Sequence, residues 1–452
     1  MTAADSKQTG TTPTERFLAS LCERSFLGLW CYPNVFRDQG KTGSGDGKEV
    51  CDVLVAFREH LILFSDKNCA FPDGEISLAW RRWYKRAVYE AAKQLYGAER
   101  WITKYPDRIY LDSQCTQRLP IDLPMPGQAR VHRIVVAQGA GRACLAHVGG
   151  TSGSLMLCPK MRAPVDAIPS SDGLGPEPFV IGQSPGSFFH VLDDVTLPVV
   201  LRELDTIADL VDYLSWKEAF IQSGHLGFSA GEEHLVAYYL ECLHTGLDPS
   251  VPLMEGRITG LDETFGPSVR SSTWYIEERE RLRPSYAWDR MVQMLAEDIL
   301  AERMTPLFGD VETVAVHERR SRALASAPRR VRLDLAMSFR EVLQTDLGTR
   351  FRLVRHPLQW DTLYLFLVLA RGSIPQLEYR KIRAKMLQVY AAVHGSRNPD
   401  VQHVVGICTG PASSGDDLSH EVVYIDRAHW SPEHERLAAD AERLLGPEGY
   451  FK

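Results

Sequence analysis

The stretch DVLVAFREHLILFSDKN, residues 52–68, constrains the fold of this 452-residue chain more than any other. Two apolar runs, roughly Val50–Phe57 and Leu61–Lys67, flank the polar tripeptide REH. Such a pattern predicts two neighbouring antiparallel strands joined by a tight turn. The second run ends on the polar residues SDK, which makes this end of the hairpin a candidate catalytic edge.

The alternation of side chains along a strand decides which polar groups meet at that edge. Asp52 shares one face of the first strand with the apolar residues two and four positions further on. Ser65 and Lys67 share one face of the second strand, whereas Asp66 points to the other face unless a bulge re-aims it. The tight connection is therefore expected to bring Asp52 near Ser65 and Lys67.

A carboxylate and a lysine in this arrangement suit metal-assisted hydrolysis of phosphodiesters. The carboxylate of Asp52 would hold Mg²⁺, a hard cation that prefers oxygen ligands. The metal polarises the phosphate and lowers the pKa of a bound water. Lys67 would orient that water and stabilise the developing charge.

The order of these elements resembles the core of the PD-(D/E)XK nuclease superfamily, in its Mrr-like, RecB-like and NERD-like branch. The matching stretch covers roughly residues 13–137: a helix with an acid, a strand with Asp52, a short turn, a strand ending in Lys67 and a helix with a glutamine. The resemblance implies an α/β (α+β) fold with a restriction-endonuclease-like core, in which a central mixed sheet is flanked by helices. Asp52 would be its metal-binding aspartate, Lys67 its motif lysine and Glu23 its helix acid. Glu15 fits less well because it lies further upstream.

Ser65 departs from the motif, which has Asp or Glu at this position. Three interpretations stay open. The site is degenerate and inactive, or a bulge brings Asp66 into the acid position, or the acid is supplied by the next helix, as the resemblance allows.

The next helix, expected from about Ser77 to Trp101, offers candidates for the third interpretation. An apolar stripe at helical spacing predicts its buried face, with these members: Trp80, Trp83, Tyr84, Ala87, Val88, Ala91, Leu95 and Ala98. Gln94 is expected inside this stripe and Glu90 at its edge. RecB-like nucleases place a glutamine on this helix, so the resemblance gives Gln94 a catalytic role and Glu90 a role in metal binding.

Three basic residues, Arg82, Arg86 and Lys93, lie just beyond Glu90 on the same helix. They are candidates for contacts with DNA phosphates, and a solvated helix face is the alternative. The net charge of −7 argues against a protein that coats nucleic acid non-specifically, although it leaves room for a local basic groove.

Nine scattered cysteines without a C-x-x-C pair, a polar N-terminus and no long apolar run predict a cytoplasmic protein with reduced thiols.

We expect a flexible tail over residues 1–12 and a nuclease-like domain over 13–221. This domain would carry a Gly/Ser/Pro-rich insertion at about 138–187 and one amphipathic helix over 197–221. Residues 222–452 are expected to form a helical and β-α-β-β C-terminal α/β domain, and the basic run 318–332 is expected to be a solvated connector.

The leading functional expectation is an endonuclease that depends on Mg²⁺ or Mn²⁺ and acts on DNA, in a bacterial defence or DNA-processing setting by analogy. The C-terminal domain would recruit a protein partner or read the substrate, and a homodimer fits such an enzyme. The first alternative is a catalytically degenerate scaffold or binding protein on a nuclease fold. The second is a hydrolase or transferase with its site in the 138–187 insertion.

Overall fold

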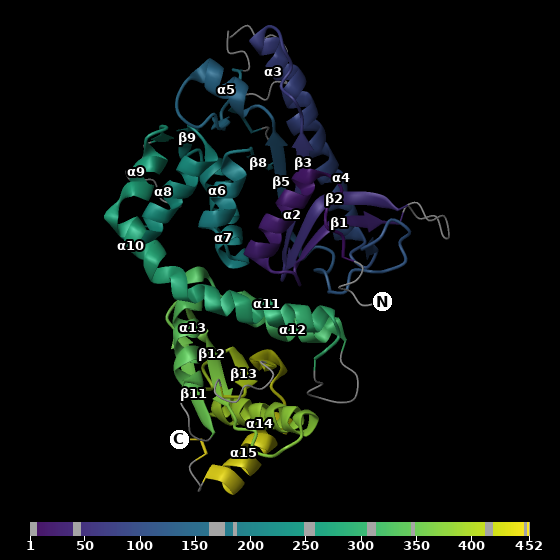
Figure 1. Cartoon of the computed structure of the whole chain (residues 1–452), viewed down its shortest axis with the longest axis vertical. Helices are drawn as coiled ribbons and strands as arrows, with labels where there is room; N and C mark the ends of the chain where they lie inside the picture. The colour runs from purple at the N-terminus through teal and green to yellow at the C-terminus, as the bar shows by residue number, and fades with distance from the viewer. Residues whose placement is uncertain are drawn as a thin grey trace. The chain divides into compact units, whose positions relative to one another are not determined.

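The computed structural model divides the chain into two compact units, Asp5–Glu280 and Arg281–Lys452 (Figure 1). The residues that it describes are 7–38, 47–161, 177–183, 188–247, 258–304, 313–344, 349–411, 419–446 and 450–451. Within these ranges no helix is both long and apolar enough to cross a membrane. All nine cysteines fall in these ranges and are free thiols.

A six-stranded mixed sheet organises the first unit, in the order β4-β1-β2-β3-β5-β8. Its strands are β1 (Cys31–Arg37), β2 (Lys48–Phe57), β3 (His60–Asn68), β4 (Ile109–Tyr110), β5 (Arg130–Gln138) and β8 (His190–Leu192). Neighbours from β4 to β3 pair antiparallel, whereas β5 and β8 continue the sheet parallel to β3. The expected mixed α/β class is confirmed.

Strands β2 and β3 form an antiparallel hairpin, as predicted. Leu54 pairs with Leu63, and Ala56 pairs with Leu61. These residues share a face with Asp52 on β2 and with Ser65 and Lys67 on β3 because side chains alternate along each strand. The face assignment made from the alternation is therefore confirmed.

Helix α2 (Pro13–Phe26) packs against β1, β2 and β3. Thr12 and Glu15 form a capping box at its N-terminus. The helix ends at Phe26, because Leu27 adopts a positive φ of 66° and the chain then enters β1.

A continuous helical segment packs against β2, β3 and β5. It consists of α3 (Ile76–Tyr84), a π-helical turn η1 (Lys85–Tyr89) and α4 (Glu90–Lys104). Every member of the predicted apolar stripe is buried. Asp66 contacts Thr14 of α2, whereas its neighbours Ser65 and Lys67 face α4, so α2 and α4 cover opposite faces of the sheet.

The remainder of the first unit surrounds a second, four-stranded sheet, ordered β10-β9-β6-β7. Its strands are β6 (Met156–Leu157), β7 (Val180–Ile181), β9 (Leu226–Ser229) and β10 (Thr259–Leu261). The helices are α5 (Gly141–Val148), α6 (Thr196–Glu203), α7 (Ile207–Gln222), α8 (Glu232–Thr245), α9 (Phe265–Ser271) and α10 (Thr273–Leu282), of which α10 crosses the division between the units. The single helix expected over 197–221 is two helices, because Thr206 caps α7 by accepting from the backbone N–H of Asp209.

The division after Glu280 lies well beyond the expected boundary at residue 221. A buried ion pair between α7 and α8 accounts for part of this difference. Lys217 donates to both carboxylate oxygens of Glu232 at 2.7 and 2.6 Å, and both side chains are almost fully buried. Tyr213 donates to the same carboxylate at 2.5 Å. These contacts tie α8 to the N-terminal unit.

The second unit is built on the sheet β11-β12-β13-β14. Its strands are β11 (Arg350–His356), β12 (Gln359–Val368), β13 (His403–Thr409) and β14 (Glu421–Asp426). Its helices are η2 (Arg283–Ser285), α11 (Tyr286–Leu300), α12 (Val314–Ala325), α13 (Arg329–Leu343), α14 (Gln376–Arg397), η4 (Arg427–His429) and α15 (Pro432–Leu445). The predicted β-α-β-β order is present as β12-α14-β13-β14. Strand β11 and helix α15 were not predicted.

The basic run 318–332 is not the solvated connector that was expected. It lies on α12 and α13, and Arg332 is buried with its guanidinium donating to Asp289 at 2.6 Å and to the carbonyl oxygens of Ala325 and Ala327. Arg329 is also buried and donates to Asp289. These arginines stabilise the contact of α13 with α11.

Candidate active site

A cleft of about 480 Å³ opens where the ends of β2 and β3 meet helix α4. The lining residues that had been selected from the sequence are Asp52, Ser65, Lys67, Glu90, Lys93 and Gln94. They come from three elements that are separated along the chain, and the cleft brings them together. It is therefore the candidate active site.

Asp52 is the most buried acid of this cleft, with 8% of its surface exposed. Its Oδ2 accepts a hydrogen bond of 2.5 Å from the backbone N–H of Asp66. Burial raises the pKa of Asp52 to about 6, although the charge of Lys67 and the hydrogen bond from Asp66 act in the lowering direction. The group can therefore release its proton near neutral pH and accept a cation.

Ser65 and Lys67 enter the cleft from β3. Ser65 is buried, and Lys67 is half-buried. The influence of Lys67 on the pKa of Asp52 indicates that its ammonium group lies close to this carboxylate. Ser65 thus stands beside the aspartate and the lysine, at the position where the motif has an acid.

Glu90 and Gln94 enter the cleft from α4, directly after the π-helical turn. Both side chains are exposed. Gln94 was expected inside the buried stripe, and this expectation is wrong because the cleft leaves this edge of α4 uncovered. π-Helical turns of this kind are frequent at functional sites.

Asp66 lies on the opposite face of β3, as its position in the alternation predicted. Its Oδ1 accepts a 2.6 Å hydrogen bond from the side chain of Gln138, and Thr14 of α2 also bonds to it. Burial raises its pKa, with these hydrogen bonds acting in the lowering direction. Asp66 does not line the cleft.

The acid of α2 that influences Asp52 is Glu15 rather than Glu23. The charge of Glu15 raises the pKa of Asp52 and of Asp66. Glu23 forms an ion pair with Lys7 and its side chain is 46% exposed. The end of α2 leads into β1, which pairs with β2. The start of the helix, which carries Glu15, is therefore the part that comes near Asp52.

Three further charged residues of the cleft, Arg37, Lys48 and Glu49, were not selected from the sequence. The alternation could have found Lys48, which is four residues before Asp52 and shares its face. Arg37 could not be found in this way, because it reaches the site by pairing with Lys48 across β1 and β2. Arg82 and Arg86 are exposed and lie outside the cleft, whereas Lys93 lines it.

The cleft thus combines a buried aspartate, a lysine on the same face, two exposed acids and a basic rim. Such a set can hold a hard divalent cation through carboxylates and bind an anionic substrate through the rim. Comparisons of this chain with protein-family models, with curated proteins and with solved structures gave no match.

Proposed function

We propose that this chain is a metal-dependent nuclease with a restriction-endonuclease-like core, which hydrolyses phosphodiester bonds in DNA with Mg²⁺ or Mn²⁺. The observation that carries the proposal is that Asp52, Lys67 and Glu90 line one cleft. The order of the elements supports it, because α2, the β2–β3 hairpin, α4 and β5 follow the sequence of the superfamily that the chain resembles.

The proposed metal ligands are the carboxylates of Asp52 and Glu90. Mg²⁺ usually takes one or two carboxylates and keeps several waters, so these two acids suffice for a site of this type. Glu90 would replace the acid that is missing at Ser65. Lys67 would orient the attacking water, and Gln94 would hold the phosphate or that water.

The basic rim would hold the substrate backbone. Arg37, Lys48 and Lys93 line the same cleft as the two acids. Positive charge beside a metal-binding carboxylate is suited to a phosphodiester, whose bridging phosphate is anionic. The proposed setting is cytoplasmic, in bacterial defence or DNA processing, with the second unit binding a partner and with a homodimer as the assembled form.

The test is DNA cleavage by the wild type and by matched variants. Supercoiled and single-stranded DNA are incubated with Mg²⁺ or Mn²⁺ and with the wild type, Asp52→Asn or Lys67→Met. Cleavage is expected for the wild type and is expected to be lost in both variants. Glu23→Gln serves as the control, because this acid lies outside the cleft. Cleavage that survives both cleft substitutions unchanged contradicts the proposal.

A second candidate function, a nuclease fold that binds without cleaving, is favoured by one observation. Ser65 is buried in the cleft at the motif's acid position, and a serine hydroxyl is a weaker ligand for Mg²⁺ than a carboxylate. DNA binding without cleavage, with no Mg²⁺ bound at any concentration, would support this alternative.

A hydrolase or transferase site in the 138–187 insertion is the third expectation, and residues 162–176 and 184–187 of that insertion lie outside the described part of the chain.

A further inference from the structure

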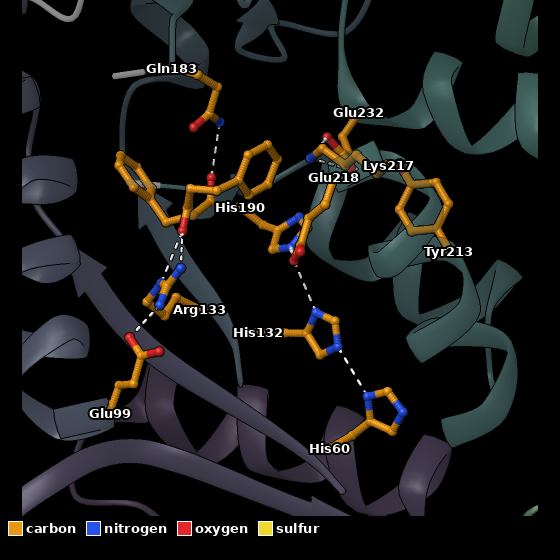
Figure 2. Close-up of polar contacts among 12 residues, drawn as sticks. His60, Glu99, His132, Arg133, Gln183, His190, Tyr213, Lys217, Glu218 and Glu232 are labelled. Carbon is orange, nitrogen blue, oxygen red and sulfur yellow. Dashed lines mark hydrogen bonds and ion pairs between the residues drawn. The ribbon is translucent and has the colours of Figure 1, made fainter. Parts of the chain in front are cut away.

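A second group of polar residues lies on the face of the sheet away from the cleft. His132 on β5 and His190 on the adjacent strand β8 point toward Glu218 of α7 (Figure 2). One carboxylate oxygen, Oε1 of Glu218, lies 3.0 Å from Nδ1 of His132 and 3.0 Å from Nε2 of His190. Two strands and one helix thus direct three nitrogen and oxygen donors at one point.

We propose that His132, His190 and Glu218 bind a divalent transition metal of the zinc type. This site goes beyond the proposed nuclease function and does not depend on it. A histidine pair with one glutamate is a donor set that zinc accepts, with a fourth position for water.

The spacing of the donors fits such an ion. Two ligand atoms that each lie about 2.0–2.1 Å from a tetrahedral zinc are roughly 3.3 Å apart. The two nitrogen–oxygen distances of 3.0 Å are close to this value. One donor atom from each of the three residues lies within 4.8 Å of the others. Small movements of side chains, without movement of the backbone, would bring the three donors around the ion.

His60 supplies the outer partner that metal-binding histidines commonly have. Its Nδ1 lies 3.2 Å from Nε2 of His132, the nitrogen that faces away from Glu218 (Figure 2). The Nδ1 atom of His60 can accept a hydrogen bond when the proton of its ring is on Nε2. A hydrogen bond donated by His132 Nε2 would leave Nδ1 of His132 unprotonated and directed at the metal.

His190 differs from His132, because it has no such outer partner in the part of the chain that the structure describes. Its side chain is almost fully buried between β5 and α7, and Nδ1 has no hydrogen-bond partner among the described residues. Glu218 is therefore the polar group that orients this ring. The side chain of Glu218 is 29% exposed, which gives an ion a path from solvent.

The two sites are separate. His132 pairs with Ile62, which lies three positions before Ser65 on β3 and therefore faces the opposite side of the sheet. The chemistry also differs, because imidazole suits zinc whereas Mg²⁺ prefers oxygen ligands. Zinc binding and DNA cleavage can therefore be measured independently.

The test uses chelator-treated full-length protein and zinc alone as the probe. Bound zinc is counted after dialysis, and Co²⁺ absorption reports tetrahedral coordination. We expect one zinc per chain in the wild type and in Asp52→Asn, and loss of this zinc in Glu218→Gln and His132→Gln. His60→Ala is expected to weaken binding about 10–100-fold.

His225→Gln is the matched control, because it removes a histidine of the same unit outside the group. It is expected to keep the zinc. Circular dichroism checks that each variant is folded, and Glu218→Gln preserves shape and a hydrogen-bonding oxygen at a partly exposed position. Absence of zinc from the wild type, or unchanged zinc affinity in folded Glu218→Gln, overturns the proposal. Zinc lost in Asp52→Asn but kept in Glu218→Gln places the ion in the cleft instead, and also overturns it.

Discussion

The carboxylate of Asp52 accepts the backbone N–H of Asp66, while the side chains of these two acids lie on opposite faces of the sheet. Asp52 faces the cleft together with Lys67, and Asp66 faces α2. The hydrogen bond fixes the orientation of the cleft carboxylate without bringing a second acid beside it. The second carboxylate of the proposed metal site must therefore come from another element.

The raised pKa of Asp52 predicts a pH-dependent effect of Asp52→Asn on stability. The pKa of Asp52 in the folded state is higher than its ordinary value of 3.8, so binding of the proton stabilises the fold. This contribution to stability is complete below pH 3.8 and is lost as the pH rises through about 6. At pH 7 the wild type thus carries a buried charge that asparagine lacks. Calorimetry is expected to show Asp52→Asn more stable by about 1–3 kcal/mol at pH 7, and equal to the wild type at about pH 4. A variant that is less stable at both pH values contradicts this account.

The same pKa predicts how metal binding depends on pH. Mg²⁺ competes with the proton on Asp52, so the affinity should rise as the pH increases through about 6 and then level off. Calorimetric titrations at several pH values measure this directly. An affinity that is constant between about pH 5 and pH 8 would show that Asp52 is not a ligand.

Glu90 is predicted to supply the second carboxylate. Glu90→Gln should weaken Mg²⁺ binding by at least about 10-fold and lower cleavage accordingly. A second substitution, Ser65→Asp, would return an acid to the motif position on β3, and the double variant is expected to recover part of the loss. Glu49→Gln is the matched control, because Glu49 also lines the cleft but accepts a hydrogen bond from Asn34. If Glu90→Gln cleaves like the wild type and Glu49→Gln does not, Glu49 is the ligand.

The basic rim makes a prediction about salt. Replacing Lys93 or Lys48 with glutamine should weaken DNA binding and reduce the slope of log affinity against log salt by about 1. Arg82→Gln and Arg86→Gln are the controls, since both residues are exposed on the same helical segment but lie outside the cleft. Binding curves at several salt concentrations compare the two pairs. Equal losses from both pairs would indicate a diffuse electrostatic surface rather than the cleft.

The buried pair of Lys217 and Glu232 predicts a large effect on stability. Lys217→Met leaves a buried carboxylate without its cation and should cost about 3–5 kcal/mol. The double variant with Glu232→Gln, which keeps an acceptor for Tyr213, should recover most of this loss. Glu23→Gln removes a more exposed pair and should change stability by less than about 1 kcal/mol. An additive double variant would show that the pair is not coupled.

Local periodicity predicted the parts of the site that lie on single elements. The two-residue alternation placed Asp52 with Lys67 and separated Asp66 from them, and helical spacing predicted the buried stripe of α3 and α4. Residues that meet through tertiary packing were out of reach. Glu15 approaches Asp52 because α2 is joined to β1, and β1 pairs with β2. Glu49 lies three positions before Asp52 on β2, so the alternation does not place the two acids on the same face.

The histidine group shows the same limit more clearly. His132 and Glu218 are 86 residues apart in the sequence, and no spacing pattern connects them. Their meeting depends on the parallel addition of β8 to β5 and on the docking of α7, and the sequence did not indicate either. The break between α6 and α7 does have a signal in the sequence, because Thr206 followed by Asp209 is typical of the start of a helix.

Calorimetric titration of Mg²⁺ into the wild type and into Asp52→Asn tests the central claim most directly. Mg²⁺ prefers oxygen ligands, so the histidine group should not contribute to the signal. The account predicts saturable binding by the wild type and its loss in the folded variant, together with the loss of DNA cleavage. Saturable Mg²⁺ binding that is unchanged in Asp52→Asn, or no binding by the wild type at any concentration, would contradict it.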